Sequence, residues 1–250
     1  MNSDALKPRK PKALFRRWVL AFWITVAAVA AVSLQAFEIP STSMENTLLV
    51  GDHIFVYRER LAVGEHSIQV LPSRKIQQGD VVVFLSPEER GLFSVKRILA
   101  IPGDRVHFRD GVLYRNGKSV DEPYVTHKNH DLNAYRDNFP AVAPSEQFGV
   151  RNEEWASSFS HYVDGEDIVV PPNCYFGLGD SRDVSYDSRY FGFIPGENII
   201  GKPLIIYWSF ATPAARYQMR DAGDRLSFLA HVLFHFFDLT RWSRIFQVVR

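Results

Sequence analysis

The segment PSTSMENTL, from Pro40 to Leu48, gathers small hydroxyl side chains directly after a long apolar stretch. A serine hydroxyl becomes an effective nucleophile only when a nearby base takes its proton, and acyl transfer also needs hydrogen-bond donors for the oxyanion. Ser41 and Ser43 are therefore candidates for serine chemistry, and the rest of the chain must supply the base.

The candidate base is a lysine. Histidine is the usual base, but none of the eight histidines lies in a short motif with Asp and Ser, and the chain has no Gly-x-Ser-x-Gly segment. Lysine is the other known partner of a serine nucleophile. Lys96 lies in the strand-like FSVKRIL, where alternation places Ser94, Lys96 and Ile98 on one face. Burial would lower its pKa and supply a neutral amine. Spacing alone favours a solvated surface residue, since most lysines in amphipathic strands are solvated.

An uncharged apolar run, residues 18–37, precedes this segment. About 20 such residues are enough for a helix to cross a bilayer. We expect a retained transmembrane anchor rather than a cleaved secretory signal, whose apolar region is shorter and ends in small residues. Six Lys and Arg residues within the preceding residues 1–17 place that segment in the cytoplasm and the following body outside it.

The composition favours one anchored globular body, either a single domain or a core with a smaller insertion. The net charge of +1 gives no basic surplus that would indicate a nucleic-acid partner. The single cysteine, Cys174, excludes an internal disulfide and is interpreted as a small core residue. His231 and His235 have the spacing of helical metal ligands but lack further ligands, so we expect a packed or solvated pair and no metal or cofactor.

The body is predicted to be mainly β. Runs rich in β-branched and aromatic residues predict strands over 48–57, 80–85, 92–101 and 199–210. Asp110-Gly111 and Asn116-Gly117 predict hairpin turns within 106–120. Residues 106–168 are expected to form a hairpin and loop insertion in a core made of 38–105 and 169–215. Residues 222–250 carry Leu and Phe at helical spacing, which predicts an amphipathic C-terminal helix.

Four ordered blocks follow the apolar run: PSTSMENTLLVGD, GDVVVF, VKRILAIPGDRV and GDSRDVSYDSRYFGFIP. Together they resemble the boxes of bacterial type I signal peptidases, which are membrane-anchored serine proteases with a Ser-Lys dyad. The resemblance covers about residues 18–210 and implies a bent antiparallel β core with an inserted second domain. It also implies location in the bacterial inner membrane, signal peptides of exported preproteins as substrates, and contact with membrane lipid. The translocation machinery is a further candidate partner.

The resemblance assigns roles to individual residues. Ser43 matches the nucleophile, Lys96 the general base, and Ser41 the side chain that joins the Ser43 backbone N–H in the oxyanion hole. Ser185 and Asp187 match the residues that support the lysine, and Asp187 also pairs with Arg189 in the family pattern. The shallow substrate pockets for small side chains are matched by Phe37, Ile39, Met44, Leu48 and Val95.

Three departures from the family pattern concern loop geometry. Glu45-Asn46 replaces a frequent x-Pro, Ser181 a frequent Asn, and Val184 another frequent Asn. Asp183 is interpreted as part of a surface ion-pair cluster. Two alternatives stay open: another Ser-Lys protease of related fold, and an inactive membrane-anchored β scaffold.

Overall fold

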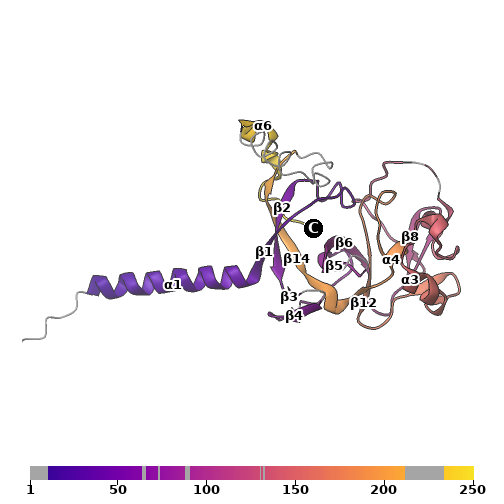
Figure 1. The fold of residues 1–250 in the computed structure, drawn as a ribbon, viewed down its shortest axis with the longest axis horizontal. Coiled ribbons are helices and arrows are strands. Elements are labelled where there is room, and N and C mark those ends of the chain that lie inside the picture. Colours follow the sequence, from indigo (N-terminus) through magenta and orange to yellow (C-terminus); the bar gives the residue numbers. More distant parts are fainter. Residues whose placement is uncertain are drawn as a thin grey trace, which may run out of the picture.

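The computed structural model describes residues 11–63, 66–72, 74–87, 91–129, 131, 133–211 and 234–250. Its main body is a curled antiparallel sheet from which one long helix projects (Figure 1). In sheet order, the seven strands are β1 (Leu34–Glu38), β2 (Asp52–Arg58), β14 (Ile199–Ser209), β5 (Val81–Leu85), β6 (Phe93–Ala100), β12 (Cys174–Leu178) and β13 (Ile194–Pro195). The prediction of a mainly β body is confirmed.

Register shifts in β14 and β12 curl this sheet. The strand β14 shifts register three times against its neighbours β2 and β5, and β12 shifts once against β6. Such irregularities bend a strand and increase its local twist. At Gly201 the strands approach so closely that a Cβ atom would collide with the Tyr57 carbonyl oxygen, so a side chain is excluded there.

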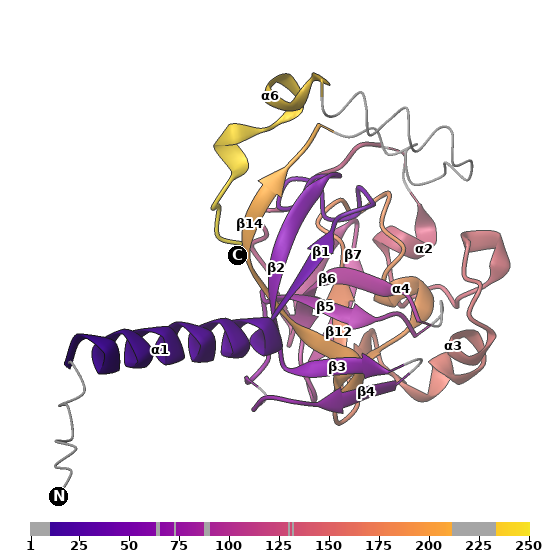
Figure 2. The ribbon, with the colours of Figure 1, turned by 60° about the vertical axis from the view of Figure 1, so that its left-hand side comes forward.

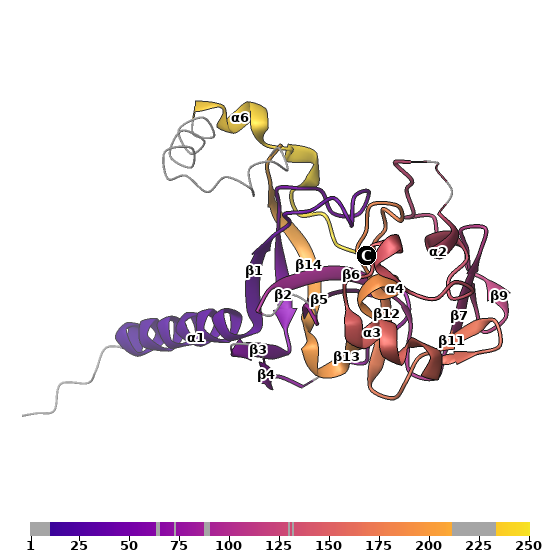
Figure 3. The same cartoon turned by 45° about the vertical axis from the view of Figure 1, so that its right-hand side comes forward.

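The predicted insertion forms a second, five-stranded sheet at the end of the molecule opposite the projecting helix (Figure 3). In sheet order its strands are β10 (Val163–Asp164), β11 (Asp167–Val169), β7 (Arg105–Arg109), β8 (Val112–Arg115) and β9 (Lys118–Ser119). Both predicted turns are present, since Asp110-Gly111 and Asn116-Gly117 have positive φ angles. The division into a core of residues 38–105 and 169–215 and an inserted domain of residues 106–168 stays a prediction.

Short elements complete the fold. The hairpin of β3 (Arg60–Val63) and β4 (His66–Gln69) was not predicted from the sequence. Neither were the short helices, because each has too few residues to show a helical period: α2 (Ala134–Asp137), α3 (Glu153–Ser158), α4 (Ser188–Phe191) and the 3-10 turns η1 (Glu146–Phe148), η2 (Phe159–His161) and η3 (Gly196–Asn198).

Two apolar clusters matter for the site. One fills the inserted region around Tyr135, Phe139 and Trp155. The other collects side chains from β1, β2, β5 and β14, and its buried members include Ile39, Met44 and Leu48. This second cluster therefore supports the segment that carries Ser41 and Ser43.

The apolar N-terminal run needs a correction. Helix α1 (Pro11–Ser33) begins earlier than predicted and ends at Ser33, because the next residues pair with β2 as strand β1, from Leu34↔Tyr57 to Glu38↔His53. Residues 34–37 are thus strand and not helix. Among the described residues, no helix meets the length and apolar character required to cross a membrane.

The C-terminal prediction is also wrong in its described part. Residues 222–233, with His231, lie outside the described residues, and from residue 235 onward the helical elements are only α6 (Phe236–Leu239) and η5 (Trp242–Arg244). It then runs extended along β14, with backbone bonds such as Phe246 N to Ile206 O and Val249 N to Leu204 O. Figure 2 shows this tail beside β14. Pairing with an open strand edge outweighs the local helical pattern here.

Candidate active site

The serine turn, defined here as residues 41–48, connects β1 to β2 and is fixed at its base. Its backbone is closed by bonds from Glu45 N to Thr42 O (3.0 Å) and from Leu48 N to Met44 O (2.8 Å). Met44 and Leu48 are 1% and 0% exposed and anchor the turn in the apolar cluster below it. This anchoring leaves the hydroxyls of Ser41 and Ser43 on the outer side, with their Oγ atoms 3.2 Å apart.

Lys96 lies in β6, opposite Val82 of β5. Ser43 and Lys96 line one cavity of about 290 Å³, together with Ser41 and Ser94. The predicted alternation of Ser94 and Lys96 is therefore borne out, since both side chains border this space. Val184, one of the departures from the family pattern, lies on its wall.

The environment of Lys96 favours a neutral amine. The side chain is 5% exposed, and burial lowers its pKa from the ordinary 10.5 to about 8, with Asp187 acting in the opposite direction and Arg189 in the same one. A group with this pKa has an appreciable unprotonated fraction at mildly alkaline pH. Lys96 is thus equipped to accept a proton from a neighbouring hydroxyl.

Asp187 and Arg189 form a buried, two-bonded ion pair. Arg189 donates from Nε to Asp187 Oδ1 (2.9 Å) and from Nη2 to Oδ2 (2.8 Å), and the two side chains are 1% and 0% exposed. Burial alone would raise the pKa of Asp187, but the Arg189 guanidinium and Lys96 hold it below its usual value. Asp187 therefore stays ionised beside Lys96.

Ser185 is buried next to this pair. Its hydroxyl helps to lower the pKa of Asp187, although its oxygen makes no hydrogen bond of normal geometry within the described residues. A side chain at Gly179 would collide with Ser185 and with the Ser43 carbonyl, so glycine is required for this close approach. The segment 179–187 thus packs directly on the serine turn.

The five predicted pocket residues belong to one apolar cluster, but they differ in accessibility. Phe37 and Val95 are partly buried, whereas Ile39, Met44 and Leu48 are 3%, 1% and 0% exposed. None of the five lines the cavity that holds Ser43 and Lys96. Ile39 and two residues of the serine turn, Met44 and Leu48, are buried in this cluster. Contact of all five residues with a substrate stays a prediction.

Several residues near the site were not singled out from the sequence. Arg97 donates from Nε to Asp180 Oδ1 (2.8 Å) and from Nη2 to Oδ2 (2.7 Å), and Thr47 Oγ1 also donates to Asp180 (2.6 Å). The Gly179-Asp180 dipeptide at the start of the last of the four blocks was the signal that could have pointed to Asp180. Asp183, interpreted as a surface charge, accepts a hydrogen bond from Asn129 N.

Comparisons with known proteins identify the family of this chain. The family model described as signal peptidase, peptidase S26, matches residues 13–208. Signal peptidase I of Aquifex aeolicus is 30% identical over 80% of this chain and 86% of its own, and that of Pseudomonas fluorescens is 34% identical over 75% and 69%. Signal peptidase I of Rickettsia conorii is 27% identical over 84% and 85%.

A solved signal peptidase I structure from Enterococcus faecalis is 30% identical and aligns with 52% of this chain and 97% of its own at a TM-score of 0.33. At this TM-score the overlap does not establish a shared fold. The family match and the identity to curated relatives do suffice, and they confirm the resemblance found in the sequence: this chain belongs to the signal peptidase family, peptidase S26.

Proposed function

We propose that this chain is a membrane-anchored serine endopeptidase that removes N-terminal signal peptides from exported preproteins after small-x-small sequences. The observation that carries the proposal is the shared cavity of Ser43 and a buried Lys96 whose pKa is lowered to about 8. In this mechanism the neutral Lys96 amine takes the Ser43 proton as the hydroxyl attacks the scissile carbonyl, and the resulting ammonium then protonates the leaving amine.

The other site residues support this step. The Ser41 hydroxyl and the Ser43 backbone N–H would donate to the oxyanion as negative charge develops on it. Ser185 and Asp187 would orient Lys96 and stabilise the ammonium that forms during the reaction. No cofactor enters the mechanism.

An extended substrate would add to a strand next to the site. Strand β12 pairs with β6 only along Arg97–Ala100, so within the described residues the same edge of 93–96 has no partner strand. An added peptide strand presents alternate side chains to one wall, so positions −1 and −3 would face the site together. Phe37 packs edge-on against Phe93 beside this edge, with the ring centroids 5.0 Å apart.

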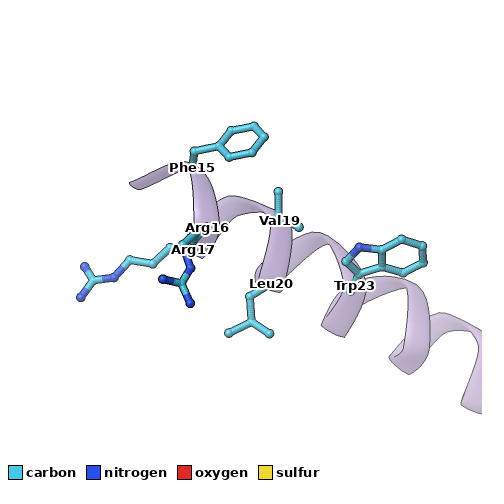
Figure 4. Close-up of a pocket in the computed structure, with 6 residues that line it drawn as sticks. All are labelled: Phe15, Arg16, Arg17, Val19, Leu20 and Trp23. Atoms are coloured by element: carbon cyan, nitrogen blue, oxygen red, sulfur yellow. The ribbon is translucent and has the colours of Figure 1, made fainter. Parts of the chain in front are cut away.

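We further propose that α1 anchors the protein in the bacterial inner membrane, with its N-terminus in the cytoplasm and the β body on the outer face. The support is the absence of charge in α1 from Trp18 to its end at Ser33 and the exposure of large apolar side chains along α1, such as Trp18 (70%) and Phe22 (62%). Figure 4 shows Arg16 and Arg17 at the N-terminal end of this stretch, before Val19, Leu20 and Trp23. Lipid is thus a proposed partner, and the translocation machinery is a second one.

One assay separates this function from its alternatives. Detergent-solubilised protein is incubated with an exported precursor that carries Ala at −1 and −3, with Ser43→Ala as the matched control. We expect one cleavage after the −1 residue, none with Ser43→Ala, and none when −1 is changed to Phe. Absence of cleavage by the wild type would favour the inactive scaffold, and cleavage that ignores the −1 residue would favour a different Ser-Lys protease.

A further inference from the structure

A segment of the inserted region contacts the chain on either side of the candidate active-site serine. We call residues 122–128 the strap. Its Thr126 N donates to Asp180 O (2.9 Å), and Arg182 N donates to Thr126 O (3.2 Å), so the strap forms a short parallel bridge with the chain around Ser181. The strap therefore lies against the same segment that packs on the Ser43 carbonyl.

The strap also holds the serine turn. Asn46 donates from Nδ2 to Tyr124 O (3.0 Å), and Thr126 Oγ1 donates to Glu45 O (3.4 Å). Glu45 forms an ion pair with Lys128. Both residues of the Glu45-Asn46 departure from the family pattern are thus used in contacts with the strap.

The backbone at Asn46 explains why proline is absent there. Asn46 has a φ of 94°, in the left-handed region that asparagine and glycine tolerate better than other residues. Proline is restricted to a φ near −65° and could not adopt this conformation. The side-chain bond to Tyr124 O gives this turn an attachment that a proline could not make.

The strap reaches the strand that carries Lys96 as well. The guanidinium of Arg97, the neighbour of Lys96, lies 3.9 Å from the centre of the Tyr124 ring. Arg97 Nη2 also donates to Thr47 Oγ1 (3.0 Å), which belongs to the serine turn. The first residue of the strap, Glu122, is fixed by a largely buried ion pair. Arg182 donates from Nη1 and Nη2 to its two carboxylate oxygens.

We propose that the strap sets the alignment of Ser43 with Lys96, and that Asn46 is the positioning residue that joins the serine turn to it. The proposal rests on the Ser-Lys function above. The strap contacts the nucleophile side through Glu45 and Asn46 and the base side through Arg97, so it can fix the two relative to each other. Misplacement of reacting groups by as little as 1 Å can lower a rate by about 10²-fold.

The test compares two left-handed asparagines in the full chain. Asn46→Gly keeps the backbone conformation accessible but removes the bond to Tyr124 O. The control, Asn173→Gly, replaces an asparagine with a φ of 57° that lies outside the strap and its contacts. We measure kcat, KM and the fraction folded at the assay temperature, using the small-x-small precursor. We expect Asn46→Gly to lower kcat per folded molecule by about 10-fold with little change in KM, and Asn173→Gly to leave kcat unchanged.

A second variant keeps the result interpretable. Lys128→Ala breaks the ion pair with Glu45 from the strap side, and it should lower kcat in the same direction by a smaller factor. A kcat per folded molecule that is unchanged in Asn46→Gly would overturn the proposal, as would an equal loss in Asn173→Gly. Failure of the Ser-Lys function is recognised separately, because Ser43→Ala or Lys96→Ala would then retain cleavage whatever the asparagine variants do.

Discussion

Arginine–carboxylate pairs occur in two contrasting settings in this molecule. On the inserted sheet, Arg109 and Glu166 are 57% and 73% exposed, whereas beside Lys96 the side chains of Arg189 and Asp187 are 1% and 0% exposed. The bond lengths are the same, 2.8 Å in each pair. Water screens the first pair and leaves it little net energy, while the second is costly to bury and strongly coupled to its neighbours.

The contrast shows where charge matters in this fold. In the buried setting each charge changes the protonation of the next, and Lys96 is placed among them with a pKa near 8. In the exposed setting the same residue types add solubility and little else. Substitutions in the two regions should therefore differ by orders of magnitude in their effects.

The largest effect should come from the dyad itself. Ser43→Ala and Lys96→Ala should each lower kcat by more than about 10³-fold, and the double variant should be no worse, since nucleophile and base act as one unit. Lys96→Arg should fail as well, because a guanidinium keeps its proton near neutral pH. Turnover with a precursor substrate checks this, and substantial activity in Lys96→Ala would remove Lys96 from the mechanism.

Breaking the buried pair should have the next largest effect. Arg189→Met leaves the Asp187 carboxylate buried without its partner, so the free energy of unfolding should fall by about 3–5 kcal/mol. Loss of the Arg189 charge should also raise the pKa of Lys96, because that charge lowers it now. Chemical denaturation and the pH profile of activity test the two effects, and a variant as stable as the wild type would contradict the first.

Removing the buried amine should stabilise the protein. The unfolded chain keeps the Lys96 proton up to pH 10.5, whereas the folded protein releases it near pH 8, so burying the ammonium costs stability below pH 8. Lys96→Met should therefore be inactive yet more stable at pH 7, by about 1–3 kcal/mol. The difference should shrink as the pH rises from 8 to 10.5, and a difference independent of pH would count against the shifted pKa.

The smallest effect is expected at the exposed pair. Arg109→Ala should change the free energy of unfolding by less than about 0.5 kcal/mol and leave kcat unchanged. Denaturation and turnover of this variant form the matched control for Arg189→Met. A loss comparable to that of Arg189→Met would mean that burial does not distinguish the two regions.

Local patterns in the sequence predicted much of the fold. Alternating β-branched residues located β2, β5, β6 and β14, and the Asp110-Gly111 and Asn116-Gly117 dipeptides located the hairpin turns. The apolar run concealed the end of α1, because the uncharged residues 34–37 continue the run and become a strand only by pairing with β2. The C-terminal tail was mispredicted for a similar reason, since its extended form depends on β14.

The candidate site was predicted in its parts but not in its connections. Ser43 and Lys96 were found from serine chemistry and from the ordered blocks, and the structure brings them to one cavity. The bonds from Arg97 and Thr47 to Asp180 join residues 83 and 133 positions apart, so no local pattern could reveal them. The positive φ of Asn46 was equally hidden, because asparagine tolerates the left-handed region without requiring it.

The pH dependence of kcat/KM tests the central claim most directly, because it reports the ionisation of the free enzyme's base. With Lys96 as the base, activity should rise with pH and level off above an apparent pKa of about 8, the value that burial gives Lys96. In Arg189→Met this limb should move to higher pH. A limb near pH 6.5, the ordinary range of histidine, that stays in place in this variant would mean that Lys96 is not the base.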